Sequence, residues 1–516
     1  MKAAPTSSAG LDGDACYLAM KTHDARFDGT FFTAVTSTGI YCRPVCRVKA
    51  PRRENCCFFH HAAQAEAAGF RPCLRCRPEL APRAASWSTE DASRILALQA
   101  ARLIDEPDAW AEDGPGAARI AARMGVSDRH LRRIFESQFG VSPLQYLQTR
   151  RLLAAKQLIA DTSLPMTQVA LASGFASVRR FNAAFVTHYG LNPSALRRAG
   201  ASAGGMAGAG SVEVRLGFRP PYDSEAMLAF FERRALGGVE SLDQAAGARQ
   251  YARTLRVTHA GRSLDGWLSL RFDPGREQLL LCVGESLAPS LPIVISRVRA
   301  MLDLDAEPMA INRALHASFP HGDGLRVPGT VDGFELAVRA VLGQQITVAA
   351  ARTLGTRLVQ AFGAAIVTPV DGLDRLFPTP AAIAGAGGDA LGRLGIVRQR
   401  QAALLALANE VMAGRLVLHA GADVPATLAA LQALPGIGEW TSQYIAMRAL
   451  RWPDAFPAGD VALQKALGVG SARAAAEASL AWRPWRGYAV LRAWHGPMPA
   501  AQPAAATSDN RNGVIA

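Results

Sequence analysis

The sequence predicts a multidomain, mainly α-helical protein. We expect a small cysteine-rich α/β domain, an all-α double helix-turn-helix domain, a small mixed α/β domain and an all-α core with a helix-hairpin-helix. Three observations support this. A chain of 516 residues is too long for one hydrophobic core. Most of its eight cysteines precede residue 77. The stretch "AGASAGGMAGAGS", Ala199 to Ser211, has the composition of a linker between a front and a back half.

Charge and composition limit the class of protein. The net charge of +13 lies mostly on the first 200 residues, which is typical of a nucleic-acid-binding surface, although a solubilising surface is the alternative. No run of 18 apolar residues occurs, so we expect no membrane partner. The first residues lack a secretory pattern, so we expect a cytoplasmic protein whose reduced thiols bind metal rather than form disulfides.

The front domain, expected over residues 1–84, contains two cysteine pairs. Cys42 and Cys46 form a Cys-x3-Cys knuckle, and Cys73 and Cys76 form a Cys-x2-Cys knuckle after a gap of 26 residues. Two such knuckles supply the four soft ligands of tetrahedral Zn²⁺. The sequence therefore predicts a small zinc-bound α/β domain, and the spacing alone favours a purely structural zinc.

The sequence around these cysteines favours a reactive site over a purely structural one. "FFTAVTSTGIYCRPVCRVKAPRRENCC" with "AAGFRPCLRCRPEL" closely resembles the N-terminal domain of the Ada family, the adaptive-response regulators that repair methylated DNA. The resemblance implies that Cys42, as a zinc-bound thiolate, accepts the methyl group of a DNA phosphotriester. Four thiolates on Zn²⁺ carry a charge of −2, and methylation lowers it to −1, so DNA affinity should rise. Phosphate contacts are expected from Arg43, Arg47 and Lys49, with a solvated basic loop as the alternative.

Residues 85–198 contain two similar helical units. "IAARMGVSDRHLRRIFESQFGVSP" turns at Gly125, and "VALASGFASVRRFNAAFVTHYGLNPSALR" turns at Gly174, with a helix between the units. The pair resembles the AraC-type DNA-binding domain. Recognition helices present their first residues to base edges, and the alternative for some of these side chains is a contact to phosphates only. The expected contacts are Arg129, His130, Arg133, Ser177, Arg179, Arg180 and Asn182.

The back half contains "LQALPGIGEWTSQYIAMRAL", Leu431 to Leu450, which reads as a helix-hairpin-helix. Gly436 and Gly438 let backbone amides approach a DNA phosphate at a helix N-terminus. Asp460 follows a proline-rich turn and opens a helix. Hairpin, turn and aspartate together resemble the helix-hairpin-helix glycosylase superfamily.

Three further segments narrow this resemblance to the bacterial inducible 3-methyladenine DNA glycosylase: "FRPPYD", "DGFELAVRAVLGQQIT" and "WRPWRGYAVLRAW". The resemblance implies a mixed α/β domain over residues 211–305, glycosylase domains over 306–495, and a linker at 199–210; a disordered tail is expected at 496–516. It makes Asp460 the catalytic carboxylate, places Gln345 as the wedge into the duplex, and allows hairpin carbonyls at Gln432, Leu434 and Ile437 to hold a monovalent cation. The residues implied around the base pocket are Trp440, Tyr444, Trp494 and Phe230.

Two alternatives accompany the hypothesis of a methyl-sensing regulator fused to an alkylbase glycosylase. The glycosylase half could be an inactive DNA clamp, with Trp440 and Trp494 as simple core and Asp460 as a helix cap. The front half could be a plain zinc-ribbon transcription factor. A monofunctional enzyme is expected, because lyase-competent relatives carry a lysine where Trp440 stands. The implied partners are double-stranded DNA and RNA polymerase.

Overall fold

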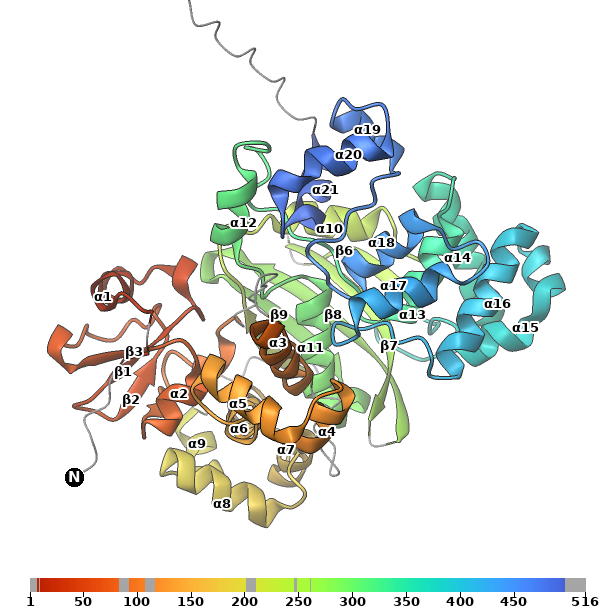
Figure 1. Ribbon diagram of the computed structural model, residues 1–516. Helices are drawn as coiled ribbons and strands as arrows, with labels where there is room; N and C mark the ends of the chain where they lie inside the picture. The colour runs from red at the N-terminus through yellow and green to blue at the C-terminus, as the bar shows by residue number, and fades with distance from the viewer. Residues whose placement is uncertain are drawn as a thin grey trace, which may run out of the picture.

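The computed structural model describes residues 7–8, 10–82, 92–106, 117–200, 210–245, 248–259 and 261–496. The cysteine-rich domain lies at one side, a central antiparallel sheet lies in the middle, and the helical back half covers the opposite side (Figure 1). The predicted fold class, a multidomain mainly α protein with small α/β parts, is confirmed. Within the described residues, no helix combines the length and apolarity that crossing a membrane requires.

The front domain is built on a small sheet of order β3-β1-β2-β4. Strand β2 runs antiparallel to β1 and parallel to β4, with Tyr41 opposite Pro72. Cys42 and Cys73 are each the next residue after that pair, so the sheet register itself brings the two knuckles together. The elements are α1 (Gly13–Lys21), β1 (Phe32–Val35), β2 (Ile40–Cys42), β3 (Cys56–Phe59), α2 (Ala62–Ala67) and β4 (Arg71–Pro72).

The next region is entirely helical in its described part and contains both helix-turn-helix units. Gly125 and Gly174 make the two turns with φ of 68° and 79°, a left-handed backbone that glycine adopts without steric cost. Ser127 and Ser177 cap the helices that follow. The helices are α3 (Ala92–Asp105), α4 (Ala117–Arg123), α5 (Asp128–Phe139), α6 (Pro143–Asp161), α7 (Met166–Ala172), α8 (Val178–Tyr189) and α9 (Pro193–Gly200).

The mixed domain is an antiparallel sheet of order β5-β9-β8-β7-β6 with helices packed against it. The predicted strands "SVEVRLGF" and "EQLLLCV" form β5 and β9, which pair along their whole length. Helix α9 continues to Gly200, two residues into the expected linker, and the remaining linker residues 201–209 lie outside the described residues. The elements are β5 (Ser211–Gly217), α10 (Ser224–Glu232), β6 (Glu240–Ala245), β7 (Ala248–His259), β8 (Arg262–Asp273), β9 (Gln278–Gly284) and α11 (Leu291–Met301).

The back half is a helical array in which α17 and α18 form the predicted helix-hairpin-helix. The expected tail lies almost wholly outside the described residues, which end at residue 496. The helices are α12 (Pro308–Leu315), α13 (Gly333–Leu342), α14 (Val348–Phe362), α15 (Pro380–Arg393), α16 (Arg398–Met412), α17 (Val424–Gln432), α18 (Glu439–Arg448), α19 (Val461–Ala466), α20 (Ala472–Ala478) and α21 (Arg486–His495).

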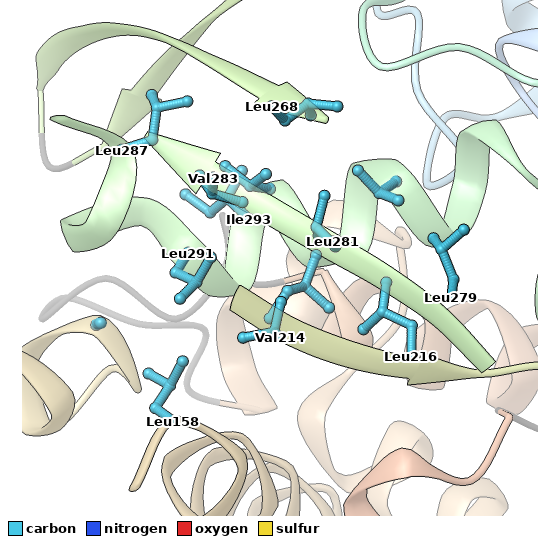
Figure 2. Packing of buried hydrophobic residues seen from close by; sticks show 14 of the residues in the cluster. Leu158, Val214, Leu216, Leu268, Leu279, Leu281, Val283, Leu287, Leu291 and Ile293 are labelled. Atoms are coloured by element: carbon cyan, nitrogen blue, oxygen red, sulfur yellow. The ribbon is translucent and has the colours of Figure 1, made fainter. Parts of the chain in front are cut away.

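One hydrophobic core includes residues from both sides of the predicted linker. Leu158 of α6 packs in the same buried cluster as Val214 of β5 and Leu291 of α11 (Figure 2). Gln157 of α6 also donates a hydrogen bond of 3.0 Å from Nε2 to the carbonyl of Arg215. The helix α6, which joins the two helix-turn-helix units, therefore packs directly on the sheet of the mixed domain.

A single arginine ties the front domain to the back half. Arg219, fully buried, donates from Nε to the carbonyl of Asp28 at 2.7 Å and from Nη2 to that of Pro82 at 3.1 Å. Its Nη1 donates to the carbonyls of Asp305 and Ala306 at 3.0 and 3.1 Å. These bonds satisfy buried carbonyls from two distant segments at once.

Candidate active site and metal centre

The four knuckle cysteines converge as the sequence predicts. The sulfurs of Cys42, Cys46, Cys73 and Cys76 all lie within 4.8 Å of one another. The Arg43 amide donates to Cys76 Sγ at 3.4 Å, a contact that suits a thiolate sulfur. Four converging sulfurs with an amide donor fit Zn²⁺, whose structural sites are tetrahedral and are often made of four cysteines. The remaining cysteines lie outside this cluster.

Exposure does not single out the expected reactive thiol. Cys42 is 8%, Cys73 7% and Cys46 3% exposed, whereas Cys76 is partly exposed. The choice of Cys42 as methyl acceptor therefore rests on the resemblance and not on its accessibility.

The basic residues at the first knuckle divide into two kinds. Arg43 is 7% exposed; its Nε donates to Asp28 Oδ1 at 2.8 Å and its Nη1 to the Cys76 carbonyl at 3.1 Å. This contradicts the expected phosphate contact, because the Arg43 guanidinium is buried and forms an ion pair with Asp28. Arg47 and Lys49 are exposed, as a phosphate contact requires. Arg75 is exposed between the two cysteines of the second knuckle. It is a further candidate for a phosphate contact, and its place beside Cys76 in the sequence could have indicated this.

The recognition helices α5 and α8 present most of the expected side chains to solvent. The exposed ones are Arg129, Arg133, Arg179, Arg180 and Asn182. His130 is half-buried, and its Nδ1 lies 3.1 Å from Nη2 of Arg133. Ser177 accepts a hydrogen bond of 3.3 Å from the Arg180 amide, so its hydroxyl serves as the helix cap.

The hairpin between α17 and α18 lies beside the expected wedge residue. Gly436 has a φ of 75°, and a side chain at Gly438 would meet no atom within 4 Å, which leaves the backbone there open to approach. Gln345 is exposed at the tip of the loop after α13, with a left-handed φ of 54°. Its neighbour Gln344 donates from Nε2 to the Gly436 carbonyl at 2.8 Å and to Thr441 Oγ1 at 2.9 Å. These hydrogen bonds join the loop that carries Gln345 to the hairpin.

The Asp460 carboxylate is the polar centre of the aromatic site. Its Oδ2 accepts a hydrogen bond of 2.8 Å from Trp440 Nε1, and its Oδ1 accepts one of 3.2 Å from Trp494 Nε1. Oδ1 also accepts the Leu463 amide at 2.7 Å, which caps α19. Asp460 is therefore a helix cap, as one alternative held, and in addition the shared partner of two indoles from separate helices.

The remaining aromatic residues are arranged around two arginines. Trp440 and Tyr444 stack with centroids 5.3 Å apart and planes at 9°. Phe230 does not join that stack: it is 4% exposed, with the Arg234 guanidinium 3.7 Å and that of Arg448 4.8 Å from its ring centroid. The Arg448 guanidinium thus contacts both rings, since it also lies 5.3 Å from the Tyr444 centroid.

Arg448 and Arg234 are site residues that sequence reasoning missed. Arg448 follows Tyr444 by four residues on α18, a spacing that places both on one helix face and could have indicated the contact. Its Nη1 donates to Tyr444 Oη at 2.5 Å. Burial raises the pKa of Tyr444, but the positive charges of Arg448 and Arg234 outweigh it, and the pKa lies below the ordinary value.

Family models match four successive parts of the chain. They are the metal binding domain of Ada (residues 15–79), a helix-turn-helix domain (120–199), the AlkA N-terminal domain (213–332) and the HhH-GPD superfamily base excision DNA repair protein (338–471). Their order is the order of the regions described above.

Relatives match both the whole chain and its back half. The chain is 38% identical over 495 residues, covering 94% of it and 96% of the relative, to a "probable bifunctional transcriptional activator/DNA repair enzyme AlkA" of Mycobacterium tuberculosis. It is 34% identical over 281 residues, 54% of the chain and 96% of the relative, to "DNA-3-methyladenine glycosylase 2" of Escherichia coli. A solved 3-methyladenine DNA-glycosylase from Archaeoglobus fulgidus matches 54% of the chain and 96% of its own at 20% identity and a TM-score of 0.46. The chain belongs to the AlkA-type family of bifunctional transcriptional activators and DNA repair enzymes, in which an Ada metal-binding domain and a helix-turn-helix domain precede a base-excision domain.

Proposed function

We propose that this chain is an alkylation-damage response protein that releases alkylated bases such as 3-methyladenine from DNA and senses methylated DNA through its front half. The observation that carries the glycosylase assignment is the Asp460 carboxylate held by the indoles of Trp440 and Trp494. A carboxylate that served only as a helix cap would not need two indole donors from other helices. The similarity to the DNA-3-methyladenine glycosylase 2 of Escherichia coli supports the substrate class.

The proposed reaction uses the lability of the damaged base. The target nucleotide leaves the stack and enters the aromatic site, while Gln345 fills the gap in the duplex. The C1′–N bond breaks, and its electron pair neutralises the cationic base. Asp460 stabilises the oxocarbenium character that develops on the sugar and orients the water that adds to C1′, and the proton that this water loses passes through the carboxylate to solvent. The electron-rich faces of the indoles favour a cationic ring.

We propose that the enzyme is monofunctional. A lyase step requires an amine that attacks C1′, and the residue at that position of α18 is Trp440. Its indole N–H is engaged with Asp460 and has no nucleophilic lone pair.

A methyl-transfer reaction at Cys42 is the second proposed activity. Zn²⁺, when bound by the four cysteines, keeps their sulfurs deprotonated. Cys42 Sγ then attacks the methyl carbon of a phosphotriester; the S–C bond forms, the C–O bond breaks, and a phosphodiester anion leaves. Loss of one thiolate charge reduces repulsion of the DNA backbone. The convergent sulfurs, the match to the metal binding domain of Ada and the exposed Arg47 and Lys49 support this proposal.

The DNA contacts, domain limits and further partners belong to the same proposal. Exposed Arg129, Arg133, Arg179, Arg180 and Asn182 would read promoter DNA, and the hairpin glycines would approach phosphates. The working domain limits remain 1–84, 85–198, 211–305 and 306–495, with tails and linkers outside them. RNA polymerase as a partner would follow from an activator role. A monovalent cation at the hairpin would have to share the Leu434 carbonyl, which already accepts the Ile437 amide at 3.2 Å.

Two experiments test the two activities separately. Release of 3-methyladenine from methylated duplex DNA by the full chain is expected for wild type and strongly reduced for Asp460→Asn; no release by wild type would support the inactive-clamp alternative. Peptide mass spectrometry after exposure to DNA with methylphosphotriesters should find the added methyl on Cys42. Methyl on the more exposed Cys76, or on no cysteine, contradicts the assignment.

A further inference from the structure

The chain that leaves the cysteine cluster is buried immediately. A 3-10 turn, Pro78–Leu80, begins two residues after Cys76, and the side chain of Glu79 in this turn is 1% exposed. Glu79 forms ion pairs with Arg77, whose Nε lies 3.0 Å away, and with Lys156 of α6, which is also buried. A buried charge that loses its partner is costly, so these ion pairs hold the turn firmly against α6.

The same turn contacts the end of the first strand of the mixed domain. A Cβ atom at Gly217, the last residue of β5, would lie only 2.5 Å from the Leu80 carbonyl oxygen, so the two backbones approach more closely than a side chain permits. Two residues later, the Pro82 carbonyl accepts a hydrogen bond of 3.1 Å from Nη2 of Arg219. The chain from Cys76 to Pro82 is therefore packed between α6 and the back half.

The first knuckle reaches Arg219 through two buried side chains. Arg43 follows Cys42; its amide donates to Cys76 Sγ at 3.4 Å and its Nη1 to the Cys76 carbonyl at 3.1 Å. Its Nε donates to Asp28 Oδ1 at 2.8 Å, and the Asp28 carbonyl accepts Nε of Arg219 at 2.7 Å. All three side chains are buried. A movement of either knuckle must therefore move Arg219 as well, or leave a buried polar group without its partner.

Arg219 continues this link into the helices of the aromatic site. Its Nη1 donates to the carbonyls of Asp305 and Ala306 at 3.0 and 3.1 Å. Ala306 lies in one buried cluster with Met447 of α18 and Ala493 of α21. These two helices carry the indoles that donate to the carboxylate of the aromatic site. Buried contacts thus connect the cysteine sulfurs with that site without interruption.

We propose that the four-cysteine cluster controls the base-excision half: bound metal holds Arg43 and the chain after Cys76 where Arg219 can bind both halves, and loss of metal releases them. The free energy of metal binding fixes the two knuckles, because a site of this kind is not preformed in a disordered segment. Without metal, Arg219 loses its partners in the front domain, and local opening of α18 and α21 requires less free energy. This role goes beyond base release and methyl transfer, and it rests only on the metal site.

Packing alone could also join the two halves, and metal would then matter only to the front domain. The core that contains Leu158, Val214 and Leu291 is formed by residues from α6 onward, so it should persist without metal. The hydrogen bonds of Arg219 differ, because the Asp28 and Pro82 carbonyls belong to the domain that metal stabilises. Coupling through Arg219 therefore predicts a response of the back half to metal, whereas packing alone predicts none.

Hydrogen exchange of the full chain, followed by mass spectrometry, distinguishes these cases. Wild type is compared with Zn²⁺ bound and after Zn²⁺ is removed by a chelator, on peptides that cover α18 and α21. We expect their exchange to become roughly tenfold faster or more on removal, the scale of a lost buried hydrogen bond. Helix α15, whose buried residues lie in another cluster, should change less than about threefold.

Arg219→Met is the variant that should uncouple the two halves. It removes the guanidinium and no zinc ligand, so it should still bind zinc. Exchange of α18 and α21 should already be fast with zinc bound and should not change on removal. Asp28→Asn is milder: it keeps the carbonyl that Arg219 binds and breaks only the ion pair with Arg43, so it should lose most of the metal response. Arg276→Met, at an exposed side chain, should behave like wild type.

Three outcomes overturn the proposal. Metal removal that speeds exchange in the front domain alone shows that the cluster acts only on its own domain. An equal increase in α15 indicates loss of the whole fold. An equal response of α18 and α21 in wild type, Arg219→Met and Asp28→Asn shows that the coupling does not pass through these side chains. Exchange reports on this link whether or not the chain releases a base, so the base-release assay detects failure of the glycosylase proposal separately.

Discussion

The indole of Trp440 donates a hydrogen bond from Nε1 to Oδ2 of Asp460 at 2.8 Å, from the first turn of α18 to the residue that caps α19. Trp494 of α21 donates to the other carboxylate oxygen at 3.2 Å. The carboxylate is thereby fixed by groups from three helices before any substrate arrives. A pre-positioned negative charge of this kind requires no reorganisation when positive charge develops on the sugar.

Asp460→Asn should reduce the rate of 3-methyladenine release by roughly two orders of magnitude or more, the scale of one deleted electrostatic stabiliser. The amide oxygen can still accept the Leu463 amide and cap α19, so we expect an intact fold and near-normal DNA binding. Single-turnover release, a thermal unfolding curve and a DNA-binding titration measure these three properties. A rate equal to that of wild type would mean that Asp460 is only a cap.

Trp440→Phe is the matched control for that variant. It keeps an aromatic ring next to Tyr444 and keeps the Asp460 charge, and it removes the indole N–H donor together with part of the ring surface. We expect a loss of about tenfold, smaller than for Asp460→Asn, because one hydrogen bond that orients the carboxylate is worth about 1–2 kcal/mol. A loss as large as that of Asp460→Asn would show that the indole itself, rather than the charge, dominates.

Cys73→Ala should release the metal and unfold the front domain. Structural zinc supplies roughly 10 kcal/mol or more of folding free energy in comparable small domains. Metal analysis is expected to find one zinc per chain in wild type and none in the variant. Cys57→Ala is the control, because Cys57 lies outside the four-sulfur cluster and should leave zinc bound. Full zinc in Cys73→Ala would exclude Cys73 as a ligand.

Arg180→Ala should weaken binding to promoter DNA without changing base release. Arg180 is exposed on the first turn of α8, where a recognition helix meets base edges, and it contacts no residue of the aromatic site. Loss of a bidentate contact to a base costs about 1–3 kcal/mol, and the measurement is binding at a fixed salt concentration. Parallel loss of base release would mean that the two halves act as one DNA-binding unit.

Glu66 should make the stability of the full chain depend on pH near neutrality. It is buried between the front domain and the helix-turn-helix region, accepting hydrogen bonds from Tyr41 Oη at 2.9 Å and Thr149 Oγ1 at 2.8 Å. Burial raises its pKa from 4.5 to about 7, against the opposing effects of Thr149, Tyr41 and Lys156. Between these two values the folded protein holds a proton that the unfolded chain has lost. Its contribution to stability is therefore full below about pH 4.5 and decreases as the pH rises to 7.

Glu66→Gln keeps the shape of the side chain and removes this titration. The free energy of unfolding of wild type should fall by about 3 kcal/mol relative to the variant between about pH 4.5 and 7.5. His188, 3.7 Å from Glu66, also titrates, but its pKa is lowered by burial and acts with the opposite sign, so the difference between the two proteins isolates Glu66. Glu54→Gln, at an exposed carboxylate, is the control. Identical pH profiles for wild type and Glu66→Gln would contradict the raised pKa.

Arg219→Met should destabilise the whole chain and not one domain alone. The change leaves the carbonyls of Asp28, Pro82, Asp305 and Ala306 without their donor, at a cost of about 2–4 kcal/mol. Arg276→Met, at a side chain that is 76% exposed, should have no effect. The midpoint of thermal unfolding measures the difference. An unchanged midpoint in Arg219→Met would show that the contact between front and back halves contributes nothing to stability.

The sequence by itself determined the features that depend on local spacing. The cysteine pairs, the glycine turns of the helix-turn-helix units and the hairpin glycines are each set within a few residues, and the structure places them as expected. Asp460 and the two indoles were also identified from the sequence, because the family motifs carry them.

Only the tertiary structure decided which charges are free and which side chains meet. Arg43 looked like a phosphate contact beside Cys42, yet Asp28, 15 residues away, takes its guanidinium into the interior. Phe230 packs against the guanidinium of Arg448, which is held by carbonyls about 120 residues earlier in the chain. Leu158 of α6 shares a core with the sheet, although a glycine-rich stretch separates them in sequence. Burial and ion pairing arise from contacts between distant segments, so local patterns could predict the elements and the ligands but not these partnerships.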